Sequence, residues 1–138
     1  MVLRNDTSVS ISNEMYKDFS FPYEQKITSY FGQVSFHYCG KDVPWFDSML
    51  DIDGCKAINV GRVPGLAYGL PYLQKTMEKL SKKKQYLSLI HLDEDDLLNS
   101  KFIELYKQYG GGFSVAVDCE NEDKAKRFMY IWILPQTP

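Results

Sequence analysis

The chain has 138 residues, of which 44% are hydrophobic, 14% aromatic and 25% charged, and its formal net charge is −2. This composition is typical of one globular domain spanning residues 1–138. The nearly balanced charge gives no reason to expect nucleic acid or an anionic membrane as a partner. The sequence shows neither an apolar run long enough to cross a bilayer nor a secretory signal. Without such a signal, the three cysteines indicate reduced thiols in a cytoplasmic protein.

The N-terminal third predicts a short strand and then a helix. Residues 2–4 form the short apolar strand, and the helix is expected to be capped by Ser12 and ended by Gly32. Pro22 lies inside this helix and predicts a kink or a break near Phe21. Six apolar residues recur at helical spacing and predict one face buried in the core. They are Met15, Phe19, Tyr23, Ile27, Tyr30 and Phe31.

Four further strands alternate with helices along the rest of the chain. Strands are expected at 34–39, 56–60, 86–91 and 113–117, and helices at 45–50, 73–80, 94–109 and 125–132, the last stopped by Pro135. This alternation predicts βαβ units and a parallel sheet. The pattern alone leaves two arrangements open, an open doubly wound sheet and part of a (β/α)8 barrel. A closed barrel needs eight strands and typically about 250 residues.

Several motifs, in this order, resemble the uroporphyrinogen decarboxylase superfamily. The segments that carry the resemblance are Asp6-Thr7-Ser8, Ile11-Ser12-Asn13-Glu14, Pro22-Tyr23, Phe36-His37-Tyr38-Cys39-Gly40, Ala57-Ile58-Asn59-Val60-Gly61 and Gly110-Gly111-Gly112-Phe113. The fourth is similar to a strand end that reads His-x-Cys-Gly in the cobalamin-dependent methyltransferase branch. The resemblance implies an α/β fold, a partial TIM barrel of about five βα units. The chain is then expected to be the C-terminal portion of that barrel, without its first strands.

The same resemblance implies a zinc site formed by His37, Cys39 and Cys119, with a methylcobamide (corrinoid) as methyl donor in the intact enzyme. Residues two apart in a strand point to the same side, so His37 and Cys39 can face one point. In a parallel barrel the carboxyl ends of all strands open on one face. Two thiolates and an imidazole leave a fourth position open, which is typical of catalytic zinc. Residues 120–123 depart from the superfamily, which continues with Gly and Pro after that cysteine.

Other polar residues at the same expected face are candidates for lesser roles. Arg62 and His91 are predicted substrate-binding residues, Arg62 for an anionic group and His91 because it ends a strand. Asp93, Asp118 and Glu120 are candidates for a partner of His37 or an extra metal ligand. Cys55, at a strand start and so at the opposite face, is expected to be a packed, inert thiol.

The first functional hypothesis is a fragment of a zinc-dependent methyltransferase that moves a methyl group from a corrinoid to a thiol, not expected to be active alone. The alternatives are a carboxy-lyase relative acting on a tetrapyrrole, and a non-catalytic truncated assembly unit. An incomplete barrel is expected to leave apolar strand residues uncovered. The candidates are Phe36, Ile58, Val60, Leu89 and Val115. Such a surface predicts a homo-oligomer or a companion barrel half, and the chemistry suggests a corrinoid protein as a further partner.

Overall fold

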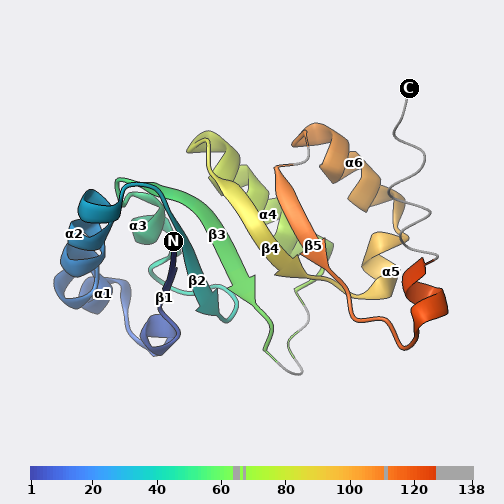
Figure 1. Cartoon of the computed structure of the whole chain (residues 1–138), viewed down its shortest axis with the longest axis horizontal. Helices are drawn as coiled ribbons and strands as arrows, with labels where there is room; N and C mark the ends of the chain where they lie inside the picture. The colour runs from blue at the N-terminus through green and yellow to red at the C-terminus, as the bar shows by residue number, and fades with distance from the viewer. Residues whose placement is uncertain (64–65, 67, 111, 127–138) are drawn as a thin grey trace.

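The computed structural model describes residues 1–63, 66, 68–110 and 112–126 and shows one parallel sheet with alternating helices (Figure 1). The strands are β1 (Val2–Arg4), β2 (Val34–Cys39), β3 (Cys55–Gly61), β4 (Tyr86–His91) and β5 (Phe113–Ala116). The sheet order is β1-β2-β3-β4-β5, and each neighbouring pair is parallel. The predicted α/β architecture is therefore confirmed. A doubly wound arrangement of these strands is excluded, because their order never reverses.

The helices follow the predicted alternation, with two differences: an additional 3-10 helix, η1, follows β1, and the helix expected at 94–109 is divided. They are η1 (Thr7–Ser10), α1 (Asn13–Phe19), α2 (Phe21–Phe31), α3 (Phe46–Leu50), α4 (Gly69–Lys82), α5 (Glu94–Leu97) and α6 (Ser100–Gln108). The expected single helix over 94–109 is two helices, because the Asn99 side chain accepts a hydrogen bond from the Lys101 N–H at 3.0 Å and caps a new one. Residues 122–126 are also helical, and the remainder of the predicted last helix, with Pro135, lies outside the described residues. None of the helices in the described part of the chain has the length and apolarity that crossing a bilayer demands.

The predicted break near Pro22 is confirmed. Helix α1 ends at Phe19 and α2 begins at Phe21, so Pro22 stands in a first turn, where a missing N–H is tolerated. The predicted cap is also present, since the Ser12 side chain accepts a hydrogen bond from the Met15 N–H at 3.2 Å. Gly32 follows α2 with a φ of 78°, a conformation that favours glycine.

The predicted buried face of this helical segment is wrong. Phe19 and Tyr23 are each 68% exposed and Tyr30 is 83% exposed, so these rings face outward. The buried residues are instead Tyr16, Glu24 and Thr28, which also recur at helical spacing one position further along the chain. The structure therefore buries the stripe next to the apolar one.

A buried hydrogen-bond network explains this choice of face. The Tyr16 hydroxyl and the Asn5 side-chain amide both donate to the Glu24 carboxylate. The Tyr16 ring stacks on Trp45 with the ring centres 4.8 Å apart, and the Trp45 Nε1–H donates to the Ser8 carbonyl at 2.5 Å. These contacts tie α1, α2, the start of α3 and the segment after β1 into one core.

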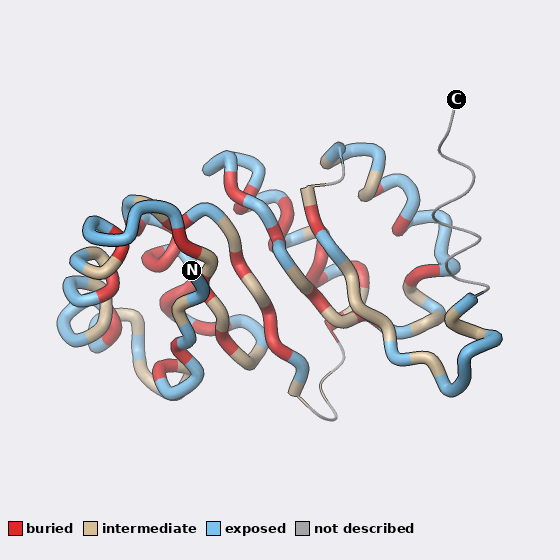
Figure 2. Tube along the Cα trace, viewed as in Figure 1, coloured by how far each residue is buried: buried red, intermediate tan, exposed pale blue. Residues whose placement is uncertain are grey.

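Buried and more exposed residues alternate along β2 and β3, so one face of the sheet is covered and the other is open (Figure 2). Sequential parallel strands joined by connections of one hand carry their helices on one face. Phe36, Ile58 and Val60 are 0% exposed under those helices, so the expectation that they lie uncovered is wrong. Leu89 and Val115 are half-buried. The opposite face carries mostly small and polar side chains. Among them are Ser35, His37, Cys39, Ala57, Asn59 and Ser88.

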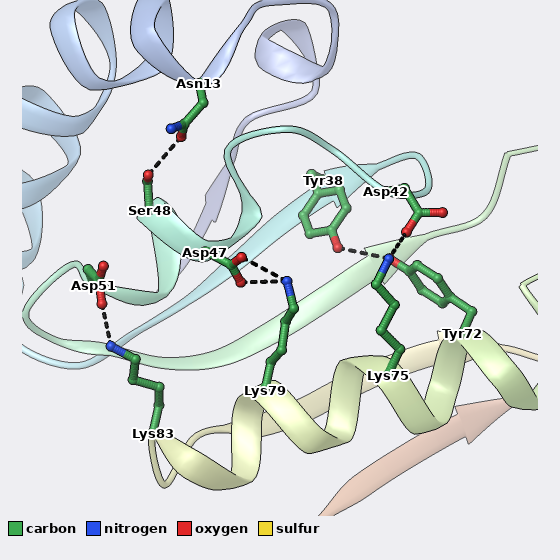
Figure 3. A network of polar contacts seen from close by, with 10 residues as sticks. All are labelled: Asn13, Tyr38, Asp42, Asp47, Ser48, Asp51, Tyr72, Lys75, Lys79 and Lys83. Carbon is green, nitrogen blue, oxygen red and sulfur yellow. Dashed lines mark hydrogen bonds and ion pairs between the residues drawn. The ribbon is translucent and has the colours of Figure 1, made fainter.

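A ladder of ion pairs aligns α4 with the segment around α3 (Figure 3). Lysines at four-residue spacing on α4 and at its C-cap pair with three aspartates: Lys75 with Asp42, Lys79 with Asp47, and Lys83 with Asp51. The Ser48 hydroxyl donates to Asn13 at 2.7 Å and links α3 to α1. The three pairs are partly solvated, so each contributes at most about 0.2–1 kcal/mol. They fix the alignment of two βα units more than they stabilise the fold.

The outward orientation of the apolar stripe gives a first prediction. Tyr16→Ala should lower the free energy of unfolding by about 3–5 kcal/mol, because it removes a buried ring and leaves Glu24 without one of its donors. Phe19→Ala and Tyr30→Ala should change it by no more than about 0.5 kcal/mol, as at other exposed positions. Urea denaturation of the three variants measures the difference. Comparable losses in all three would mean that the apolar stripe is buried after all.

A second prediction concerns pH. Burial raises the pKa of the Glu24 carboxyl in the folded chain above its ordinary value. The protonated form is then favoured by folding, so Glu24 contributes stability below the pKa of the unfolded chain and loses it as the pH rises through the folded pKa. The Glu24→Gln variant does not titrate there, and its stability should improve relative to wild type as the pH rises from the ordinary glutamate pKa of about 4.3 through the higher pKa of the folded chain. Urea denaturation across this range measures it, and a constant difference between the two proteins would contradict it.

Candidate metal centre

Three potential ligands converge at the carboxyl ends of β1 and β2. The His37 Nε2 atom lies 3.5 Å from the Cys39 Sγ and 3.6 Å from the nearer Asp6 carboxylate oxygen. His37 and Cys39 stand two residues apart on β2 and share the open face of the sheet. Asp6 follows β1, the neighbour of β2 in the sheet. All three ligand atoms lie within 4.8 Å of one another.

The spacing of these atoms suits a single metal ion. Nitrogen, sulfur and oxygen ligands bound tetrahedrally at about 2.0–2.3 Å lie roughly 3.3–3.8 Å from one another. The two distances from His37 Nε2, 3.5 and 3.6 Å, fall in this range. Three protein ligands would leave a fourth position open for a substrate or water, as in catalytic zinc sites.

The ring of His37 is already oriented for metal binding. Its Nδ1 atom lies 2.7 Å from the Asn59 Oδ1, on the adjacent strand at the paired position. An amide oxygen only accepts, so Nδ1 donates in this hydrogen bond, and Nε2 is the ring nitrogen that faces Cys39 and Asp6. This arrangement matches the second hydrogen bond that metal-binding histidines usually make.

Glycine is required beside the cluster. Gly61 pairs with Cys39 across the sheet, and a Cβ atom at this position would lie 2.4 Å from the Cys39 Sγ and 2.8 Å from the His37 Cε1. Any side chain would therefore displace both ligands. The residues present thus fit a metal ion in donor type, spacing and room.

The charge around Cys39 also favours a cation. Burial and the adjacent Asp6 carboxylate raise the pKa of the Cys39 thiol, although Arg4 partly opposes them. The side chain is then a neutral thiol near pH 7 when no cation is present. A divalent ion between Cys39 and Asp6 would displace the thiol proton and satisfy both groups.

The third predicted ligand, Cys119, is not part of this cluster. It is half-buried and follows β5, three strands away from β2. Three strand spacings amount to roughly 14 Å in a sheet. The structure therefore brings together His37 and Cys39 with Asp6, and leaves Cys119 at the far side of the same edge. Cys55, the third cysteine, is buried at the start of β3, and burial raises its pKa to about 12.

Both predicted substrate-binding residues line one pocket of about 480 Å³ at this edge of the sheet. Arg62 pairs there with Asp118, and Lys124 lies 3.2 Å from Glu94 and 2.9 Å from Glu120. The His91 Nδ1 is buried and has no hydrogen-bond partner within the described parts of the chain. Tyr68 also lines the pocket, and its hydroxyl donates to the Gly61 carbonyl beside the metal cluster.

Two residues of the site were not predicted. Asp6 belongs to a quoted motif, but its role depends on the register of β1 against β2. Asn59 occupies the orienting role for which Asp93, Asp118 and Glu120 were candidates. One signal was available for Asn59, a polar residue between two apolar residues, Ile58 and Val60, in the middle of a strand.

Comparison of the chain with protein-family models, with curated protein sequences and with solved structures gave no match. The resemblance to the uroporphyrinogen decarboxylase superfamily therefore rests on short motifs alone. A function for this chain must be inferred from its own residues and their geometry.

The close approach at Gly61 gives a third prediction. Gly61→Ala should cost about 1–3 kcal/mol of stability through overpacking and should abolish high-affinity zinc binding, because the methyl group displaces Cys39 and His37. Gly110→Ala is the matched control. Among the described residues, apart from its chain neighbours, no atom lies within 4 Å of a Cβ built there, but the φ of 60° makes the substitution cost about 1–2 kcal/mol of backbone strain. Calorimetric zinc titration of both variants tests the idea, and unchanged binding by Gly61→Ala would exclude this site.

Proposed function

We propose that the chain carries a catalytic-type zinc centre on His37, Cys39 and Asp6, in the C-terminal portion of a (β/α)8 barrel of the uroporphyrinogen decarboxylase type. The observation that carries the metal centre is the convergence of three ligand atoms around a histidine whose other nitrogen is bonded to Asn59. Structural zinc sites normally use four protein ligands, whereas an open position is typical of catalytic ones.

Support for the barrel comes from the strand order. Consecutive parallel strands with no reversal are the arrangement of one sector of a barrel, and the ligands lie at the carboxyl end, where barrel active sites lie. The polar face of the sheet would then line the barrel interior. A companion half or a second copy of the chain would be needed to close it.

The proposed reaction of the intact enzyme is transfer of a methyl group from a corrinoid to a thiol. Zinc, when bound, would lower the pKa of an incoming thiol toward neutrality. His37, Cys39 and Asp6 would bind the ion, and Asn59 would keep the His37 ring in place. The adjoining pocket, with Arg62 and His91, would hold the remainder of the thiol substrate.

Asp6 takes the place of Cys119 as the third ligand in this proposal. The geometry favours Asp6, whereas the superfamily resemblance implies Cys119. The carboxy-lyase alternative needs no metal, so zinc binding also discriminates between the two reactions.

The fourth prediction therefore concerns zinc content. The purified, reduced chain should bind about one zinc ion, and His37→Ala, Cys39→Ser and Asp6→Asn should each weaken binding at least about tenfold. Cys119→Ser should bind as wild type does if Asp6 is the third ligand. Cys55→Ala is the control for loss of a thiol elsewhere. Elemental analysis and competition with a chromogenic chelator measure these values. A wild-type chain that binds no zinc under metal-replete conditions would overturn the metal centre.

A further inference from the structure

Asn5, the residue before Asp6, is held at two points. Its backbone N–H donates to the His37 carbonyl at 2.8 Å, which continues the pairing of β1 with β2. Its side-chain amide donates to the buried carboxylate of Glu24 on α2. The position of the Asp6 backbone is therefore fixed from the sheet and from the helix layer together.

The other end of the same segment is anchored through a second branch of the network. Trp45 donates to the Ser8 carbonyl at 2.5 Å, and its ring stacks on Tyr16, whose hydroxyl donates to Glu24. Asp6 thus lies between two anchored residues. It caps η1 by position, but its side chain makes no capping hydrogen bond. The carboxylate remains available to face His37.

A glutamate at position 24 is energetically unfavourable because its side chain is buried. It is 6% exposed, and burying a carboxylate is unfavourable unless hydrogen bonds compensate. Here two neutral donors provide that compensation, Tyr16 and Asn5. An apolar residue would pack against the Tyr16 ring without this cost, but it could not hold the Asn5 amide. The feature that distinguishes Glu24 from such a residue is its bond to the segment that carries Asp6.

We infer that Glu24 is a positioning residue of the metal centre, which through Asn5 holds Asp6 at ligand distance from His37. This inference rests on the zinc centre proposed above. It assigns to a buried side chain on α2 an effect on metal affinity, although Glu24 itself touches no ligand.

The test is zinc and cobalt(II) binding by variants of the full chain. Glu24→Leu removes the acceptor of the Asn5 amide, and Asn5→Ala removes its donor. Each should weaken zinc binding about tenfold, as is usual when the groups that orient ligands are lost. The double variant should lose no more than Glu24→Leu alone, because both changes break one contact. In the cobalt-loaded proteins the sulfur-to-cobalt charge-transfer band from Cys39 should persist, while the visible ligand-field bands should shift as Asp6 is lost.

Two controls separate positioning from stability. Tyr16→Phe removes a donor to Glu24 but keeps the ring and the Asn5 bond, so its zinc affinity should match that of wild type. Leu105→Ala, in the buried face of α6, should destabilise the chain and also leave the affinity unchanged. If Glu24→Leu does not fold, Asn5→Ala decides the matter.

The outcomes are distinct. If wild type binds zinc and both Glu24→Leu and Asn5→Ala bind equally well, the positioning role is wrong and the metal centre stands. Equal losses in Leu105→Ala would assign the effect to stability and overturn the inference. If wild type binds no zinc, the metal centre itself is wrong, and this inference with it.

Discussion

The buried carboxylate of Glu24 is the interaction on which the candidate site depends. It receives hydrogen bonds from Tyr16 on α1 and from Asn5 after β1, and so joins two helices to the edge of the sheet. A carboxylate needs such donors when it is buried, and satisfying them dictates which side of α1 and α2 faces the sheet. The apolar side chains on the neighbouring stripe, such as Phe19 and Tyr30, are consequently turned outward. The hydrogen bonds of the buried carboxylate therefore decide which side of these helices faces the core, and the hydrophobicity of the neighbouring stripe does not.

The parallel register of β2 and β3 places the proposed ligands beside the residues that orient them or leave room for them. His37 pairs with Asn59 and Cys39 with Gly61, so each proposed ligand on β2 has its orienting or space-giving partner directly across on β3. The same alternation sends Phe36 and Val60 under the helices and leaves polar side chains on the open face. Because side chains alternate between the two faces of a strand, the two ligands on β2, the hydrogen-bond partner of His37 and the glycine beside Cys39 all lie on one face. No loop has to adopt a special conformation to bring them together.

Features that depend on residues close together in the sequence were predicted, and features that depend on contacts between distant segments were not. The strands, the Ser12 cap and the break near Pro22 depend on neighbouring residues, and all were predicted correctly. The shared orientation of His37 and Cys39 is equally local. The role of Asp6 was not predicted, because it depends on the register between β1 and β2. The outward face of α1 was not predicted either, since the stripe pattern says only that apolar residues are aligned, and Glu24 reads as a solvent-facing residue until its donors are known.

Whether Asp6 or Cys119 is the third ligand depends on how strongly the sheet curves. The proposed reaction adds a second condition, an open position on the metal ion. Cys119 follows β5, three strands from β2, and it approaches His37 only if the sheet curls further toward a closed barrel. If Asp6 stayed in place while Cys119 arrived, four protein ligands would surround the ion, which is the closed pattern of structural zinc. Activation of a thiol substrate requires an open position, so only one of the two can serve as a ligand during the proposed reaction. Because Asp6 is held through Asn5 and Glu24, curvature that admits Cys119 must either break this link or leave a closed site.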